Sequence, residues 1–145
     1  MSDLEFWHHH GGVSVPDLEA AIAWWERMLG FRLLYRSTIP SVPCEMAMVA
    51  NGNLHIELFE APEAAPPPYD RSYPDADLKT YGNKHVSFAV RDVDVFAEEL
   101  RRRDADIVWV KHFPGGKANI FMRDLFGNLI EFVQNPKPES AISTL

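Results

Sequence analysis

The chain contains one pattern of residues twice, and this repeat limits the folds that it can adopt. In both copies a histidine stands seven residues before an aspartate that opens a helical pattern, and the tripeptide Gly-Asn-Leu leads into a strand that carries a glutamate. The matching residues are His10, Asp17, Gly52 and Glu57 in the first copy and His85, Asp92, Gly127 and Glu131 in the second. The histidines are 75 residues apart and the glutamates are 74 apart. A repeat of this length indicates two similar units, each with an apolar face that must be covered.

Periodic apolar residues predict the same elements in both copies, in the order strand, helix, strand, strand, strand. The first helix begins at Asp17, whose carboxylate can cap free amides of the first turn, and it ends at Gly30. The second helix begins at Asp92. The expected strands are 9–15, 31–35, 45–49 and 54–59 in the first copy, and 85–90, 107–110, 119–123 and 129–133 in the second. The predicted fold class is α+β, built from two pseudo-symmetric βαβββ modules.

The sequence divides into four parts, which we expect to form a single domain over residues 1–145. The parts are module 1 at about 6–60, a linker at about 61–83, module 2 at about 84–134 and a tail at 135–145. The linker is rich in proline, which lacks a backbone donor and fixes φ, so we expect neither a helix nor a central strand there. A segment of this length is either a connector or a lid over a site.

Composition excludes some classes of partner. The 145 residues carry a formal net charge of −7, and the densest basic run, 101–103, is followed at once by acidic residues. Binding to nucleic acid or to an anionic membrane surface requires clustered cations, so we expect neither. The chain has one cysteine, Cys44, and no apolar run of membrane-spanning length. We therefore expect a cytoplasmic protein whose partner is a small-molecule substrate.

The paired histidines and glutamates form a candidate metal site. Alternation along the strands places each of them on the face opposite the apolar residues that a helix covers. A glutamate between apolar strand residues needs a compensating partner, because an unpaired buried carboxylate is costly. Two imidazoles and two carboxylates suit one divalent ion among Zn²⁺, Ni²⁺, Co²⁺, Mn²⁺ and Fe²⁺. The predicted ligands are His10, Glu57, His85 and Glu131, with His8 as an alternative to His10 on the same strand face.

The two His…Asp helix starts, the two hairpins and the closing stretch 123–131 resemble the vicinal oxygen chelate superfamily, over about residues 6–134. Its members include glyoxalase I, methylmalonyl-CoA epimerase, fosfomycin-resistance enzymes, extradiol dioxygenases and metal-free bleomycin-resistance proteins. The resemblance implies that the two modules form a cup-shaped mixed sheet with helices on its outer face, and that the chain is a homodimer. It also implies ligands from the first and last strands of each module, in an order similar to that of glyoxalase I. The stretch after Glu57 lacks the Thr-x-Asn sequence of glyoxalase I, which weighs against a glutathione thioester as substrate.

This resemblance implies a metal-dependent lyase or isomerase that transfers a proton on a substrate with two neighbouring oxygens. Glu131 is the first choice for the group that moves the proton, and Glu57 is the second. The predicted substrate contacts are His55, Trp109, Phe113 and Arg123. Two alternatives stay open: an Fe²⁺-dependent extradiol-type dioxygenase, and a protein that binds a small molecule without turnover.

Overall fold

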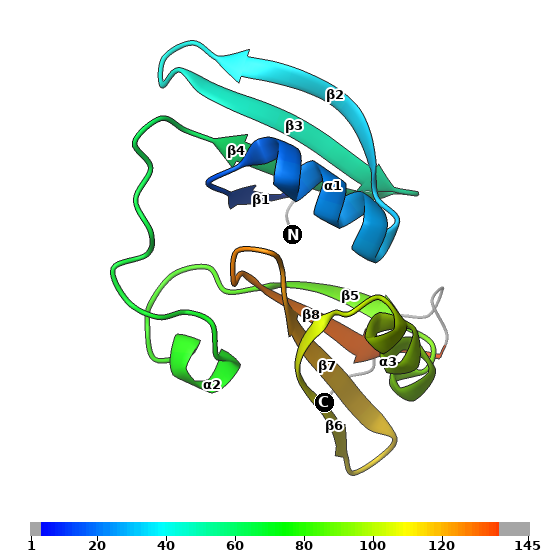
Figure 1. Ribbon diagram of the computed structural model, residues 1–145. Helices are drawn as coiled ribbons and strands as arrows, with labels where there is room; N and C mark the ends of the chain where they lie inside the picture. Colours follow the sequence, from blue (N-terminus) through cyan, green and yellow to red (C-terminus); the bar gives the residue numbers. More distant parts are fainter. Residues whose placement is uncertain (1–3, 137–145) are drawn as a thin grey trace. The chain divides into compact units, whose positions relative to one another are not determined.

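The computed structural model describes residues 4–136, and the chain divides into two compact units (Figure 1). Unit 1 comprises Met1–Ala65 and unit 2 comprises Pro66–Leu145. Each unit has its own four-stranded sheet and its own long helix. The part of the expected tail from residue 137 onward lies outside the described residues.

Unit 1 follows the predicted order of one strand, one helix and three further strands. Its elements are β1 (Gly11–Ser14), α1 (Leu18–Leu29), β2 (Arg32–Ile39), β3 (Cys44–Asn51) and β4 (Leu54–Glu60). The strands lie in the order β1-β4-β3-β2, with β1 parallel to β4 and the other pairs antiparallel. The first and last strands of the module are therefore neighbours, so residues from its two ends lie side by side.

Unit 2 repeats this plan after a short helix. Its elements are α2 (Pro74–Asp77), β5 (Val86–Val90), α3 (Val93–Arg102), β6 (Asp106–Phe113), β7 (Lys117–Arg123) and β8 (Leu129–Gln134). The strands lie in the order β5-β8-β7-β6, again with the first and last parallel. The prediction of two βαβββ modules is confirmed.

A bulge at the same place in both modules extends the likeness to backbone detail. The pairing of β2 with β3 shifts between Leu33 and Tyr35, and that of β6 with β7 shifts between Ile107 and Trp109. An extra residue in one strand bends it and turns the side chains beyond it to the other face. Because of the bulges, Tyr35 and Trp109 occupy equivalent positions in the two sheets.

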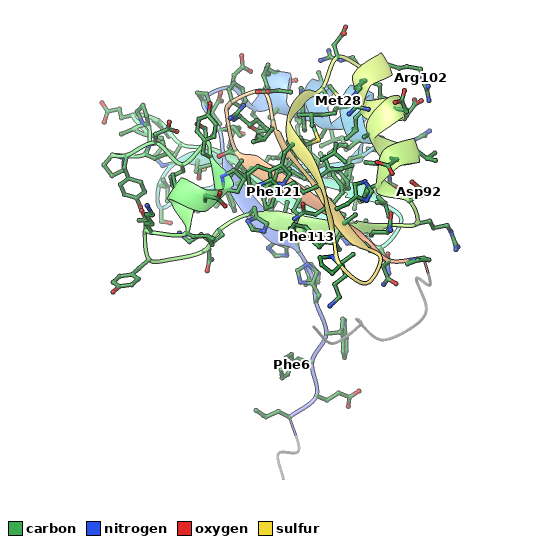
Figure 2. All side chains as sticks on the ribbon, turned by 90° about the horizontal axis from the view of Figure 1, so that it is seen from below. Phe6, Met28, Asp92, Arg102, Phe113 and Phe121 are labelled. Carbon is green, nitrogen blue, oxygen red and sulfur yellow. The ribbon has the colours of Figure 1, made fainter. Side chains whose placement is uncertain are left out.

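The two long helices begin at the predicted caps. The Asp17 carboxylate accepts a hydrogen bond from the amide of Ala20 at 2.9 Å, and Gly30 ends α1 with φ of 70°. That left-handed conformation favours glycine, which has no Cβ to clash. Asp92 caps α3 in the same way, and Figure 2 shows it at the opposite end of that helix from Arg102. Within 4–136, none of the helices combines the length and the apolar surface that crossing a bilayer demands.

The core of each unit lies between its helix and one face of its sheet. Helix α1 contacts β2, β3 and β4, and helix α3 contacts β6, β7 and β8 (Figure 1). The fully or nearly fully buried residues that fill these layers are Trp25, Val49, Ile56 and Leu58 in unit 1, and Val93, Leu100, Ile120, Met122 and Ile130 in unit 2. Since Ile56, Leu58 and Ile130 face the helices, the glutamates between or beside them face away from the core.

Several strands differ in length from the prediction. Strand β2 continues to Ile39 and β6 to Phe113, whereas the sequence predicted ends at 35 and 110. Both are edge strands whose last residues are mostly polar, so alternation of apolar residues does not mark their ends. Strand β1 begins at Gly11 rather than at 9, because its parallel pairing with β4 starts there.

The linker is more ordered than its proline content suggested. The expectation of no helix there is wrong, because α2 begins at Pro74, in the first helical position, where no backbone donor is needed. The carboxylate of Asp77, at the end of α2, is buried and lies 2.7 Å from Arg71 Nε and 3.6 Å from Lys84 Nζ. The guanidinium of Arg123 on β7 donates to the Ser72 carbonyl at 2.8 Å. These contacts hold the segment as part of unit 2.

Candidate functional site

His10 and Glu57 form a close pair in unit 1. His10 directly precedes β1, and the parallel register sets Gly12 of β1 beside Glu57 of β4. The His10 Nε2 atom lies 2.7 Å from Glu57 Oε2. The other ring nitrogen, Nδ1, lies 2.6 Å from Nδ1 of His9. Of the two candidates on this strand face, His8 and His10, it is thus His10 whose ring meets the Glu57 carboxylate, through Nε2.

His85 and Glu131 form the equivalent pair in unit 2. His85 directly precedes β5, and the parallel register sets Ser87 of β5 beside Glu131 of β8. The His85 Nε2 atom lies 3.5 Å from Glu131 Oε1. The edge of the His85 ring packs against Phe121, with ring centroids 4.7 Å apart. The repeat therefore reproduces the residue types and the strand register of the pair, with a longer nitrogen–oxygen distance in unit 2.

These two separations can be compared with the distance between neighbouring ligand atoms around one ion. For bonds of about 2.0–2.1 Å, two neighbouring ligand atoms lie about 2.9 Å apart at a right angle and about 3.3 Å apart at the tetrahedral angle. The observed nitrogen–oxygen distances lie on either side of this interval, with 2.7 Å in unit 1, which is also the length of a hydrogen bond, and 3.5 Å in unit 2. Imidazole nitrogen and carboxylate oxygen are also the donor types that first-row divalent ions accept. Each pair therefore fits half of a mixed nitrogen and oxygen metal site.

Neutral donors hold the Glu131 carboxylate on both oxygens. The Ser87 hydroxyl donates to Oε1 at 2.7 Å, and the Asn119 side-chain amide donates to Oε2 at 3.0 Å. The indole nitrogen of Trp109 donates in turn to the Asn119 carbonyl oxygen at 3.1 Å. Neither Ser87 nor Asn119 belongs to the residues that the repeat pattern predicted for the site. Strand parity could have indicated Ser87, which lies two residues after His85, whereas Asn119 is identified only by the register of β7 against β8.

Glu57 has different surroundings from those of Glu131. Gly12 occupies the place of Ser87, and a Cβ built on it would lie 3.1 Å from the Phe59 ring, so the ring fills the space of a side chain there. In the pairing of β3 with β4, Met46 occupies the place of Asn119. Neither residue can donate a side-chain hydrogen bond. The two carboxylates therefore share a position in the repeat but not a set of partners.

The predicted substrate contacts lie in both units. His55 is on β4, where its Nδ1 lies 3.0 Å from the Asn53 carbonyl oxygen and its ring stacks on that of His9. Trp109 packs against Phe121 on the face of the unit 2 sheet that carries Glu131.

Phe113 and Arg123 lie at opposite ends of the β6–β7 hairpin. Phe113 is the last residue of β6 and is exposed (Figure 2). Besides its bond to the linker, the Arg123 guanidinium contacts the Asp106 carboxylate at 3.2 Å and lies over the Tyr73 ring. These contacts tie Arg123 to its own unit, and a role in binding substrate stays a prediction for both residues.

Within residues 4–136, no group of three or more histidine, cysteine, aspartate or glutamate side chains is arranged to hold a metal ion. Each unit by itself contributes one imidazole and one carboxylate, which is half of the predicted ligand set. The four-ligand site stays a prediction.

Comparison of the sequence with known proteins identifies a family. Residues 9–122 match the model of a family described as the glyoxalase/bleomycin resistance protein/dioxygenase superfamily. The matched stretch includes His10, Glu57 and His85, and it ends before Glu131. No curated protein matches the sequence.

Solved structures of similar fold come from several organisms. A glyoxalase family protein from Enterococcus faecalis is 20% identical with a TM-score of 0.73, and the match covers 88% of this chain and 97% of that one. A glyoxylase/bleomycin resistance protein/dioxygenase domain from Frankia sp. EAN1pec is 22% identical with a TM-score of 0.71, covering 94% and 96%. A glyoxalase I mutant from Zea mays is 22% identical with a TM-score of 0.66, covering 89% of this chain and 45% of that one. At these identities the likeness shows the fold.

Proposed function

The chain belongs to the glyoxalase/bleomycin resistance protein/dioxygenase superfamily, and from this premise we propose that it is a divalent-metal-dependent lyase or isomerase. Its substrate is a small molecule with two neighbouring oxygens, and its reaction is proton transfer at a carbon next to a carbonyl. One observation carries the proposal: each unit brings an imidazole nitrogen and a carboxylate oxygen to 2.7 Å or 3.5 Å at equivalent positions of the repeat. A protein that only binds a hydrophobic compound has no physical need for both pairs.

The residues that would hold the ion are His10, Glu57, His85 and Glu131. When bound, a divalent ion supplies Lewis acidity to the two substrate oxygens and stabilises negative charge that develops on them. Zn²⁺, Ni²⁺, Co²⁺, Mn²⁺ and Fe²⁺ all accept this donor set.

The protein's own groups move the proton and orient the substrate. A carboxylate takes the proton from the substrate carbon, exchanges it with solvent as the carboxylic acid, and delivers a proton to the neighbouring carbon, so that one proton is taken up and one is given back. Glu131 is the proposed carrier, with Glu57 as the second candidate. Donors on both Glu131 oxygens keep its carboxylate in one orientation, which favours transfer along a fixed path. His55, Trp109, Phe113 and Arg123 are the proposed substrate contacts.

Deuterium exchange tests the proposed chemistry. The protein is stripped with a chelator, reloaded with Co²⁺ or Zn²⁺, and incubated in D₂O with hydroxyacetone as the first of a panel of small 2-hydroxy ketones. We expect metal-dependent loss of the substrate C–H signal in proton NMR, and loss of this activity in Glu131→Gln. Absence of exchange with every metal and every ketone of the panel would overturn the proton-transfer proposal.

An oxygen electrode separates this chemistry from that of a dioxygenase. The protein is loaded anaerobically with Fe²⁺ and mixed with catechol in aerated buffer. The proposal predicts no oxygen uptake above that of free Fe²⁺. Uptake that requires the protein would replace the lyase or isomerase with an extradiol-type dioxygenase.

We further propose that the protein acts as a homodimer in the cytoplasm. Its one cysteine among the described residues, Cys44, is a buried free thiol, as is usual in a reducing compartment. Light scattering on the eluting peak of a sizing column should give twice the chain mass of 16.5 kDa. A peak at the mass of one chain would contradict the dimer.

A further inference from the structure

The face of the unit 2 sheet that carries Glu131 holds a chain of hydrogen bonds that has no counterpart in the described part of unit 1. It runs from the Trp109 indole to the Asn119 side chain and on to the Glu131 carboxylate, which the Ser87 hydroxyl meets from β5. The three donor–acceptor distances are 3.1 Å, 3.0 Å and 2.7 Å. Each strand of the sheet therefore contributes one residue to this network, and two of these residues, Ser87 of β5 and Asn119 of β7, donate directly to the Glu131 carboxylate.

The orientation of the Asn119 amide follows from its two partners. Its carbonyl oxygen accepts from the Trp109 indole N–H, which can only donate. The amide nitrogen must then point the other way, toward Glu131. A reversed amide would place a donor against the indole and an acceptor against the carboxylate. Trp109 thus sets the direction in which Asn119 donates.

The Trp109 ring is itself held on two sides. The Lys111 ammonium lies 3.5 Å from the ring centroid, and Phe121 packs edge-on at 5.2 Å between centroids. Both contacts favour this position of the ring. The indole N–H therefore presents to Asn119 at a fixed place.

The equivalent positions of unit 1 supply no such chain. Tyr35, Met46 and Gly12 stand where Trp109, Asn119 and Ser87 stand in unit 2. The contact that the structure gives to the Glu57 side chain, within the part it describes, is with the candidate ligand His10 itself. The repeat therefore offers a matched control position in unit 1 for each of the three residues that position Glu131 in unit 2.

We propose that Trp109, Asn119 and Ser87 are positioning residues that hold Glu131 in the orientation required to bind the metal ion, with Trp109 acting through Asn119. Partners of this kind fix ligand geometry, and their removal typically weakens metal binding by roughly 10- to 100-fold. The inference rests on the function proposed above, because it assigns these residues to the same site.

The test measures Co²⁺ affinity by competition with a chromophoric chelator, and the visible absorption of bound Co²⁺ reports its ligand geometry. The variants are Asn119→Leu, Ser87→Ala and Trp109→Phe in the full chain. We expect Asn119→Leu and Ser87→Ala each to weaken binding by roughly 10-fold or more. Ser87→Thr, which keeps the hydroxyl, should restore the affinity and the spectrum.

A double-mutant cycle tests whether Trp109 acts through Asn119. Trp109→Phe keeps an aromatic ring and removes the N–H donor, so it should weaken binding in the wild-type background. The same change should have no further effect on top of Asn119→Leu. Equal effects in both backgrounds would overturn the proposed order of action.

Matched changes in unit 1 separate positioning from general loss of structure. Tyr35→Phe and Met46→Leu alter the equivalent positions and should leave Co²⁺ affinity within about twofold of the wild type, which is the scatter expected of uninvolved positions. If the wild type binds Co²⁺ and the unit 2 variants bind it with the same affinity, the positioning role is wrong but the proposed function stands. A wild-type chain that binds no Co²⁺ would overturn the proposed function and this inference together.

Discussion

The change Glu131→Gln should leave unit 2 folded and nearly as stable as the wild type. The glutamine side chain offers one oxygen and one nitrogen where the carboxylate offers two oxygens. Asn119 cannot reverse its amide, because the Trp109 indole holds its oxygen, so the glutamine oxygen must face Asn119. The glutamine nitrogen then faces Ser87, whose hydroxyl can accept a hydrogen bond as well as donate one. Both Ser87 and Asn119 therefore keep a hydrogen-bond partner at this position.

The size of the effect follows from these hydrogen bonds. A bond to a charged group contributes about 1.5–3 kcal/mol and a neutral one about 0.5–1.5 kcal/mol, so two bonds weaken by about 2 kcal/mol in all. Removing a charge from a partly enclosed position offsets much of this loss. We expect a net decrease of at most about 1 kcal/mol in the free energy of unfolding. Glu131→Leu removes both acceptors and should cost about 2 kcal/mol or more, because each unpaired polar group costs about 1–3 kcal/mol.

Urea unfolding of the chelator-treated protein measures both values, with circular dichroism as the signal and unchanged m values as the sign of a common unfolded state. The account requires Glu131→Leu to be clearly less stable than Glu131→Gln. If the two variants lose equal stability, the Ser87 hydroxyl does not reverse its role and the assigned hydrogen-bond directions are wrong.

Three other perturbations test the structure more widely. Burial raises the pKa of Asp124 above its ordinary value of 3.8. Its contribution to stability is therefore present in acid and lost as the pH rises through the raised pKa. In Asp124→Asn, the free energy of unfolding measured with urea should depend less steeply on pH over this range, and an unchanged slope would contradict this. The Arg71 guanidinium holds the pKa of Asp77 below 3.8. This pair therefore stabilises the fold above that value, and the stabilisation is lost as the pH falls through the lowered pKa. The free energy of unfolding of Asp77→Asn should fall less in acid than that of the wild type, and an equal fall in both proteins would contradict the role of the pair. Free Co²⁺ at 100 times its Kd should raise the free energy of unfolding by about 2.7 kcal/mol, and identical thermal midpoints with Co²⁺ and with chelator would refute binding to the folded state.

Two simple rules identified the candidate histidines and glutamates from the sequence, whereas the pairing of each histidine with one glutamate is seen only in the structure. The repeat identifies equivalent positions, and alternation along a strand identifies the face of each side chain. The first and last strands of each module are parallel neighbours, so a residue just before the first strand meets one in the last. Hence His10 lies beside Glu57 and His85 beside Glu131.

The partners of Glu131 were not accessible in the same way. Asn119 reaches Glu131 only because β7 and β8 pair in one particular register, which depends on the hairpin between them. The bulge near Trp109 moves that residue onto the same face, and apolar alternation does not reveal an inserted residue. The ends of the edge strands and helix α2 were not predicted for a related reason. Strand pairing and side-chain contacts stabilise them, and no apolar pattern in the sequence marks them.

The metal stoichiometry of protein purified without an affinity tag tests the central claim most directly. Elemental analysis after equilibration with Co²⁺ should give one ion per chain for the wild type. The ion should be lost in His10→Ala and equally in His85→Ala, because the proposed site takes ligands from both units. Two ions per chain, or one ion that persists when either histidine is replaced, would show that the pairs do not share an ion.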